Sequence, residues 1–120
     1  MCARVVELVN QERAKQGLSP LSTMTNLTAA ANIRAPELVV LFDHNRPDGT
    51  QCFTALREAN VTGYFTAGEN IAAGYSTPEA VVNGWMNSSG HRANILNSSF
   101  THIGVGYYNG YWVQMFIGVR

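Results

Sequence analysis

Two short segments near the C-terminus, separated by Asn109-Gly110, constrain the fold more than any other feature of this chain. Ile103, Val105 and Tyr107 alternate with other residues in the first segment, and the second runs from Trp112 to Ile117. Alternation with a period of two predicts strands, and Asn-Gly between two strands is the strongest short signal for a β-hairpin. We therefore expect the C-terminal part to form an antiparallel hairpin.

Before the hairpin, apolar residues recur at the 3.6-residue spacing of helices. The pattern predicts a helix from Arg4 to Gln16 and a second from about Asn26 to Phe42, with Ser22 or Thr25 as the N-cap of the second. Pro36 removes a backbone donor and clashes with the preceding turn. We therefore expect the second helix to kink there, or to restart with Pro36 in its first turn.

The middle of the chain is expected to contain shorter helices and loops. Thr54 to Ala59 predicts a short helix, and residues 60–68 indicate an irregular loop because two glycines interrupt them. Thr77-Pro78-Glu79 has the residue order of a helix start, and that helix should end near Ser89-Gly90. Helices followed by a hairpin indicate the α+β class, which becomes an α-β-α sandwich if both faces of the strands are covered.

Length and composition narrow the function classes. The 120 residues suit a single domain spanning 1–120, and 46% hydrophobic residues suffice for a core. Eight basic residues balance eight acidic ones, which leaves no electrostatic footprint for nucleic acid. No segment has the length of a transmembrane helix, and residues 1–20 lack the apolar core of a signal peptide. We expect a domain trimmed from a longer secreted precursor, although a cytosolic protein would look the same.

Several short segments, taken together and in order, resemble the bacterial type of the CAP superfamily (cysteine-rich secretory, antigen 5, pathogenesis-related 1). The segments that carry the resemblance are Leu8–Arg13, Gly17–Leu21, Ala29–Ala30, Arg34–Leu38, His44–Gly49, Gly68–Ala72, Trp85–Leu96 and Ile103–Gly106. The resemblance covers nearly the whole chain. It implies a three-layer α-β-α sandwich with a central antiparallel sheet, and an extracellular or cell-surface location.

The same resemblance implies a cleft lined by His44, Glu69 and His91. In several members of the superfamily the two histidines hold a divalent ion, often zinc, so His44 and His91 are the candidate metal ligands and Glu69 is a third. Animal and plant members have a further glutamate in this cleft. The nearest position here is Ser88, which makes the site less acidic and predicts weaker metal binding.

The chemistry of these residues leaves several functions open. Two imidazoles and a carboxylate are good zinc ligands, but Glu69 can instead orient one histidine and leave only two ligands. Ser88, His91 and Glu69 are also the candidates for a hydrolase site, since one helical turn would bring Ser88 beside His91. The third reading is a polar network that only stabilises a structural or interaction domain.

From this set we expect a secreted binding module rather than an enzyme. No cofactor is expected to be obligatory, and Zn²⁺ or another divalent cation is the ion that the cleft would take. The expected partner is a small ligand, a peptide or a cell-surface component, and we expect a monomer. Because the resemblance implies an extracellular protein, we also expect a disulfide between Cys2 and Cys52.

Overall fold

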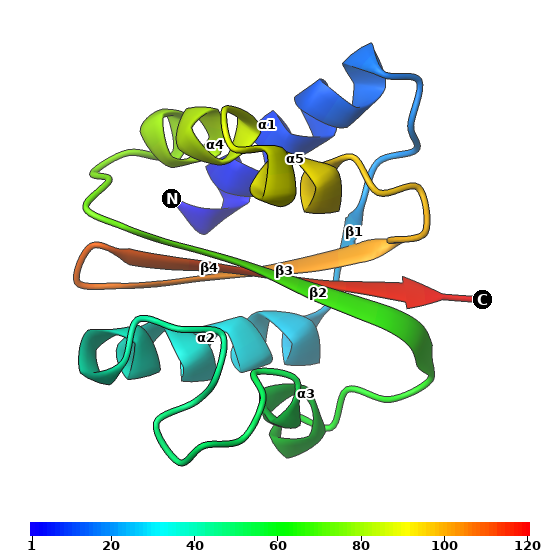
Figure 1. Cartoon of the computed structure of the whole chain (residues 1–120). Coiled ribbons are helices and arrows are strands. Elements are labelled where there is room, and N and C mark those ends of the chain that lie inside the picture. Colours follow the sequence, from blue (N-terminus) through cyan, green and yellow to red (C-terminus); the bar gives the residue numbers. More distant parts are fainter.

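Three layers make up the molecule, with a sheet between two groups of helices (Figure 1). The computed structural model describes residues 1–120. Its elements are α1 (Cys2–Lys15), β1 (Ser22–Thr23), α2 (Thr25–Val40), α3 (Thr54–Glu58), β2 (Tyr64–Ala73), α4 (Pro78–Met86), α5 (Ser89–Ile95), β3 (His102–Tyr108) and β4 (Tyr111–Val119). Helices α1, α4 and α5 cover one face of the sheet and α2 and α3 cover the other, which confirms the predicted α-β-α sandwich.

The sheet has the strand order β1-β3-β4-β2. Strands β3 and β4 form the predicted hairpin, and β4 also pairs antiparallel with β2. Both turn residues, Asn109 (φ 53°) and Gly110 (φ 85°), have the positive φ angles that an Asn-Gly hairpin turn requires. The central sheet is therefore antiparallel as expected, except for the two-residue strand β1, which pairs parallel with β3.

Strand β2 was not expected from the sequence. Residues 60–68 were predicted as loop, but the strand begins at Tyr64 and pairs with β4 as far as Ala73. The two glycines that indicated a loop have different roles, since Gly63 (φ 76°) precedes the strand and Gly68 lies within it. Pairing along the length of β4 outweighs the local preference of Gly68, and Glu69 consequently lies on a strand.

Helix α2 also differs from its prediction. It continues through Pro36 without restarting, and its N-cap is Met24 with no side-chain cap, so neither Ser22 nor Thr25 caps it. Pro36 has no N–H to donate to the carbonyl of Asn32, four residues earlier. Both residues are exposed, so this carbonyl lies on the solvent side of the helix. By contrast, Thr77 caps α4 as predicted, accepting a hydrogen bond from the Ala80 N–H at 3.1 Å. That helix ends at Met86, and α5 follows as a separate helix.

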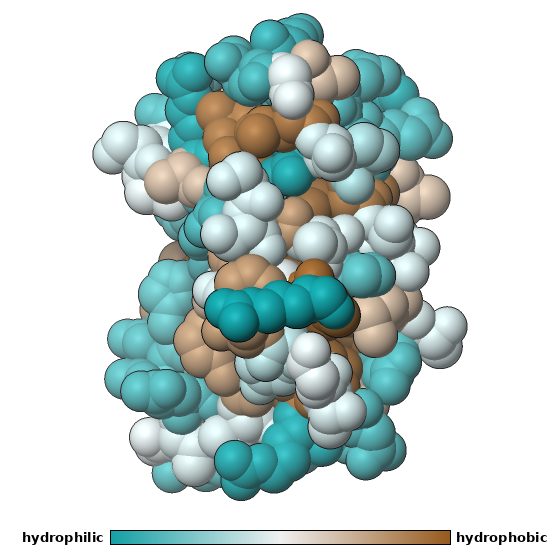
Figure 2. Space-filling model, turned by 90° about the vertical axis from the view of Figure 1, so that its right-hand side faces the viewer, coloured by the Kyte–Doolittle hydropathy of each residue, from teal (hydrophilic) through white to brown (hydrophobic).

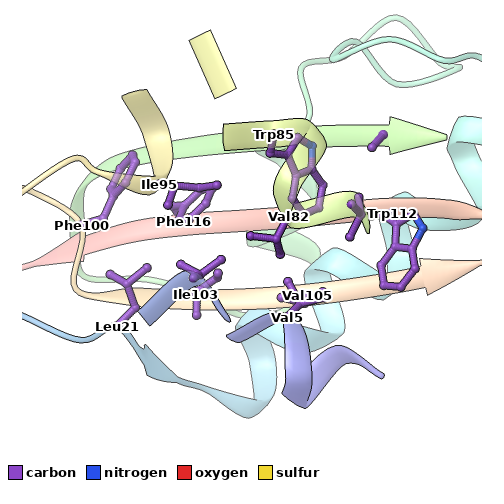
Figure 3. Packing of buried hydrophobic residues seen from close by; sticks show 13 residues of the cluster. Val5, Leu21, Val82, Trp85, Ile95, Phe100, Ile103, Val105, Trp112 and Phe116 are labelled. Carbon is purple, nitrogen blue, oxygen red and sulfur yellow. The ribbon is translucent and has the colours of Figure 1, made fainter. Parts of the chain in front are cut away.

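Each face of the sheet has its own apolar core. Side chains of β4 alternate between the two, with Trp112 and Phe116 facing α1 and α4, and Met115 facing α2. Figure 3 shows the first of these cores. On the other face α2 packs closely on β3, where a Cβ added to Gly104 would lie 2.4 Å from a backbone oxygen of α2. No helix in the molecule combines the length and hydropathy needed to cross a bilayer.

The predicted disulfide between Cys2 and Cys52 is wrong. Both cysteines are free. Cys2 lies at the start of α1 and packs against the core on that face of the sheet, whereas Cys52 lies just before α3, on the other face. The sheet separates the two thiols, so they cannot approach to bonding distance without unfolding.

Candidate functional site

Glu69 is held in place by a buried ion pair. It lies on β2, and its side chain faces α2, where Arg34 Nε donates to Oε2 at 2.8 Å and Arg34 Nη2 donates to Oε1 at 3.2 Å. The two side chains are 0% and 1% exposed. Because both carboxylate oxygens already accept from the guanidinium, Glu69 has a fixed orientation and little capacity left for a metal ion.

His44 is oriented by this carboxylate. Its Nδ1 lies 2.8 Å from Glu69 Oε1, and an ionised carboxylate can only accept, so Nδ1 carries the proton. In the neutral ring Nε2 is then unprotonated, on a side chain that is 56% exposed. The hydrogen bond to Glu69 raises the pKa of His44, and burial opposes this. The arrangement is the carboxylate-histidine pair that commonly supports a metal ligand or a general base.

A second set of charges holds the segment before and after His44. Arg34 Nη2 donates to the Asp43 carbonyl at 2.7 Å, and Arg34 Nη1 donates to Glu37 at 2.9 Å. Arg46 is only 6% exposed and pairs with both Glu37 and Glu58. These contacts fix His44 between two buried guanidinium groups. The motif His44–Gly49 is therefore a structural connection from α2 to α3 as well as a source of a site residue.

His91 approaches the other side of β2. It lies on α5, and its Nδ1 is 3.0 Å from Ser88 Oγ, which is the neighbour relation that the sequence spacing predicted. Burial lowers the pKa of His91, and the nearby charge of His44 lowers it further. The Asn70 side chain donates to the His91 carbonyl at 3.0 Å, so β2 also anchors α5.

Two neighbouring residues of β2, Glu69 and Asn70, thus form hydrogen bonds to the two histidine residues from opposite faces of the sheet. Glu69 points toward α2 and holds His44, whereas Asn70 points toward α5 and is bonded to His91 O and to Asn94. Asn70 was not identified as a site residue from the sequence. Recognition of β2 as a strand would have found it, because consecutive strand residues point to opposite faces.

Cys52 is a further residue that sequence reasoning missed. A nitrogen of His44, the Cys52 thiol and a Glu69 oxygen lie within 4.8 Å of one another, as the ligands of a metal ion could. Burial, with the negative charge of Glu69, raises the pKa of the Cys52 thiol to about 12. Burial and Glu69 therefore favour a neutral thiol, although the positive charge of Arg34 acts in the opposite direction. Arg34 also occupies the carboxylate that a metal ion would need.

The four residues His44, Glu69, Ser88 and His91 are called the histidine site below. The structure joins Glu69 to His44 and Ser88 to His91, but Glu69 does not bond His91. None of the four cavities of the molecule is lined by His44, Glu69 or His91. His44 is exposed and His91 is half-buried, so the imidazoles lie at the surface rather than in an enclosed cavity.

Residues 6–116 match the model of the cysteine-rich secretory protein family, CAP. The chain belongs to the CAP family. Among curated proteins, this CAP domain is 49% identical over 119 residues to the uncharacterized protein YkwD of Bacillus subtilis (strain 168), covering 96% of this chain and 46% of that protein. It is 35% identical over 116 residues to the uncharacterized membrane protein YlbC of the same organism, covering 95% of this chain and 33% of YlbC.

Solved structures agree with this assignment. An extracellular protein containing an SCP domain from Bacillus anthracis has a TM-score of 0.93 and 34% identity, over 98% of this CAP domain and 40% of that chain. A cysteine-rich secretory protein from Staphylococcus aureus has a TM-score of 0.84 and 25% identity, over 98% and 38%. The CAP domain thus spans less than half the length of each of these four proteins.

Proposed function

We propose that this CAP domain is an extracellular binding module whose histidine site takes a divalent cation, with zinc as the best-suited ion. The observation that carries the proposal is the fixed, surface-exposed imidazole of His44, whose Nδ1–H is held by Glu69. In the neutral ring its second nitrogen has a free lone pair, on a side chain that is 56% exposed. Imidazole nitrogen is a preferred ligand of Zn²⁺, and an outer carboxylate is its usual support.

His91 supplies the second ligand in this proposal, because β2 is the outer strand of the sheet and no further strand separates the histidines on its two faces. The charge of His44 accordingly acts on His91. Its pKa is lowered, which favours the neutral ring that a metal needs, and donation of Nδ1–H to the Ser88 hydroxyl leaves Nε2 free. Glu69 orients His44 rather than binding the ion, because Arg34 occupies its oxygens. With two protein ligands and water in the other positions, binding is expected to be weak and reversible. A bound ion would supply Lewis acidity at this surface.

Calorimetric titration of the metal-free domain with zinc tests this proposal. We expect saturable one-site binding that His44→Ala and His91→Ala both abolish. His102→Ala is the matched control, since His102 is the remaining histidine and bonds Thr101 away from the site. Binding that survives both site variants, or that His102→Ala reduces equally, contradicts the assignment.

A hydrolase remains the second candidate because Ser88 Oγ lies within hydrogen-bonding distance of His91 Nδ1. General-base chemistry requires Nδ1 to accept from the hydroxyl, whereas zinc binding through Nε2 requires Nδ1 to donate. Nitrogen NMR of the His91 ring distinguishes these tautomers. A proton on Nδ1 counts against the hydrolase, and so does peptide-cleaving activity that persists in Ser88→Ala.

The location is proposed from the relatives. The Bacillus anthracis structure is described as an extracellular protein and the Staphylococcus aureus structure as a secretory protein. We propose the same location for this domain, as one monomeric unit of a longer secreted protein that binds a small ligand, a peptide or a cell-surface component. If His44→Ala and Glu69→Ala change stability but no binding, the site is only a structural network.

A further inference from the structure

A polar cavity of about 450 Å³ lies at the end of the sandwich where the loop after α1 meets the loop between α5 and β3. Its polar side chains belong to Arg13, Ser19, Ser22, Ser98, Thr101 and His102. This end of the molecule faces the viewer in Figure 2, where much of the surface is pale or teal. The cavity shares no residue with the histidine site.

Arg13 contributes a buried positive charge with no carboxylate beside it. Its side chain comes from α1, and the residue is 2% exposed. The guanidinium donates to the carbonyls of Ser19 at 2.8 Å, Ile95 at 2.9 Å and Asn97 at 3.0 Å. Carbonyl dipoles stabilise the cation but do not neutralise it. None of the ion pairs of the molecule includes Arg13, and no acidic residue lines the cavity.

One nitrogen of this guanidinium is only weakly bonded. Nη2 carries two N–H groups, and its single contact is the Phe100 carbonyl at 3.5 Å, beyond the usual range for N–H···O bonds. The other two nitrogens of Arg13 make contacts of 3.0 Å or less. A buried donor with unused capacity is normally satisfied by water or a ligand.

Further donors lie along the same cavity. The hydroxyls of Ser19, Ser22 and Ser98 bond no other protein group, although the backbone around them is paired. Thr101 Oγ1 lies 2.7 Å from His102 Nδ1, and when this hydroxyl donates to Nδ1 the other ring nitrogen carries a proton. The cavity therefore combines one charge that no ion pair compensates with several free donors and no acidic side chain.

We propose that this cavity binds a phosphate group, either free or as a monoester. A phosphate oxyanion offers many acceptor positions in a tetrahedral arrangement, which suits hydroxyl donors on the rim and a guanidinium at the base. Its charge would neutralise Arg13, which the fold otherwise keeps buried without a counterion. The desolvation that lowers the pKa of Arg13 is consistent with a site that gains from an anion.

The test is an NMR titration of the domain with inorganic phosphate and, separately, with glycerol 3-phosphate, each against sodium chloride at matched ionic strength. Ser98→Asp places a negative charge on the exposed rim without disturbing the core. Ser76→Asp is the matched control, an exposed serine before α4 with the same change of charge. We expect saturable shifts of the amides of residues 98–102, weakened about tenfold by Ser98→Asp and unchanged by Ser76→Asp.

The two titrations and the two aspartate variants distinguish a phosphate site from a purely structural cation. Saturation by both compounds supports a site for phosphate esters, and saturation by inorganic phosphate alone supports a site for the free ion. No saturable shift with either compound overturns the proposal and makes Arg13 a purely structural cation. Equal weakening by both aspartate variants also overturns it, because the effect then reflects net charge rather than the cavity.

Discussion

The buried pair of Arg34 and Glu69 gives the sharpest prediction about stability. Glu69→Gln preserves the shape of the side chain but removes its charge, so Arg34 remains buried with an uncompensated charge toward β2. Breaking a buried pair in this way costs about 3–5 kcal/mol of unfolding free energy. Arg34 keeps its bonds to Glu37 and the Asp43 carbonyl, so we expect the low end, about 3 kcal/mol.

Urea denaturation followed by circular dichroism measures this loss. Glu58→Gln is the matched control, because Glu58 pairs with Arg46 but is 53% exposed, and a surface pair contributes less than about 1 kcal/mol. The double variant Arg34→Met/Glu69→Gln should recover part of the loss, since it removes the charge that Glu69→Gln leaves unpaired. If Glu69→Gln costs no more than Glu58→Gln, the pair does not stabilise the domain and the reasoning is refuted.

Three further predictions concern separate parts of the domain. NMR titration should give His44 a pKa above 6.5 and His91 a pKa below 6.5, and equal values would contradict the two environments. The contribution of His44 to stability is present below pH 6.5 and is lost as the pH rises through its folded pKa, whereas that of His91 is lost as the pH falls below 6.5. Gly104→Ala should destabilise the domain by about 3 kcal/mol because the new Cβ meets the backbone of α2. In the control Gly90→Ala the new Cβ meets nothing within 4 Å, so this variant should stabilise α5 by about 0.5 kcal/mol. Similar melting temperatures of the two variants would argue against the close approach of β3 to α2. Alkylation of the native protein should leave Cys52 unmodified, and unfolding without reductant should release two thiols by mass spectrometry, whereas a disulfide would leave none.

Local sequence signals predicted the elements that depend on local chemistry. The hairpin follows from Asn109-Gly110, and the start of α4 follows from Thr77, because each of these residues acts on its own turn. Strand β2 depends instead on pairing with β4, which lies more than 35 residues later in the chain. Pairing of that kind leaves little trace in the strand's own residues, and Gly68 pointed toward a loop.

The contacts of the histidine site likewise divide into local ones, which the sequence predicts, and ones between distant segments, which it does not. The contact of Ser88 with His91 was predictable because both belong to one turn of chain, and the pairing of Arg34 with Glu37 is equally local. The position of Cys52 beside Glu69 was not, because it depends on how the segment after α2 folds back against β2. The expected disulfide failed for this reason, since an inferred extracellular location says nothing about which face of a sheet each thiol occupies.

Glu69 and Asn70 point to opposite faces of the outer strand β2, so the histidine site is sensitive to the register of that strand. A shift of β2 by one residue against β4 would turn Glu69 toward α5 and Asn70 toward α2. Arg34 would then face an amide, and both histidines would lose their anchors in one step. An inserted or deleted residue within β2 should therefore abolish both halves of the site together, whereas the same change in the turn before Tyr64 leaves the pairing intact.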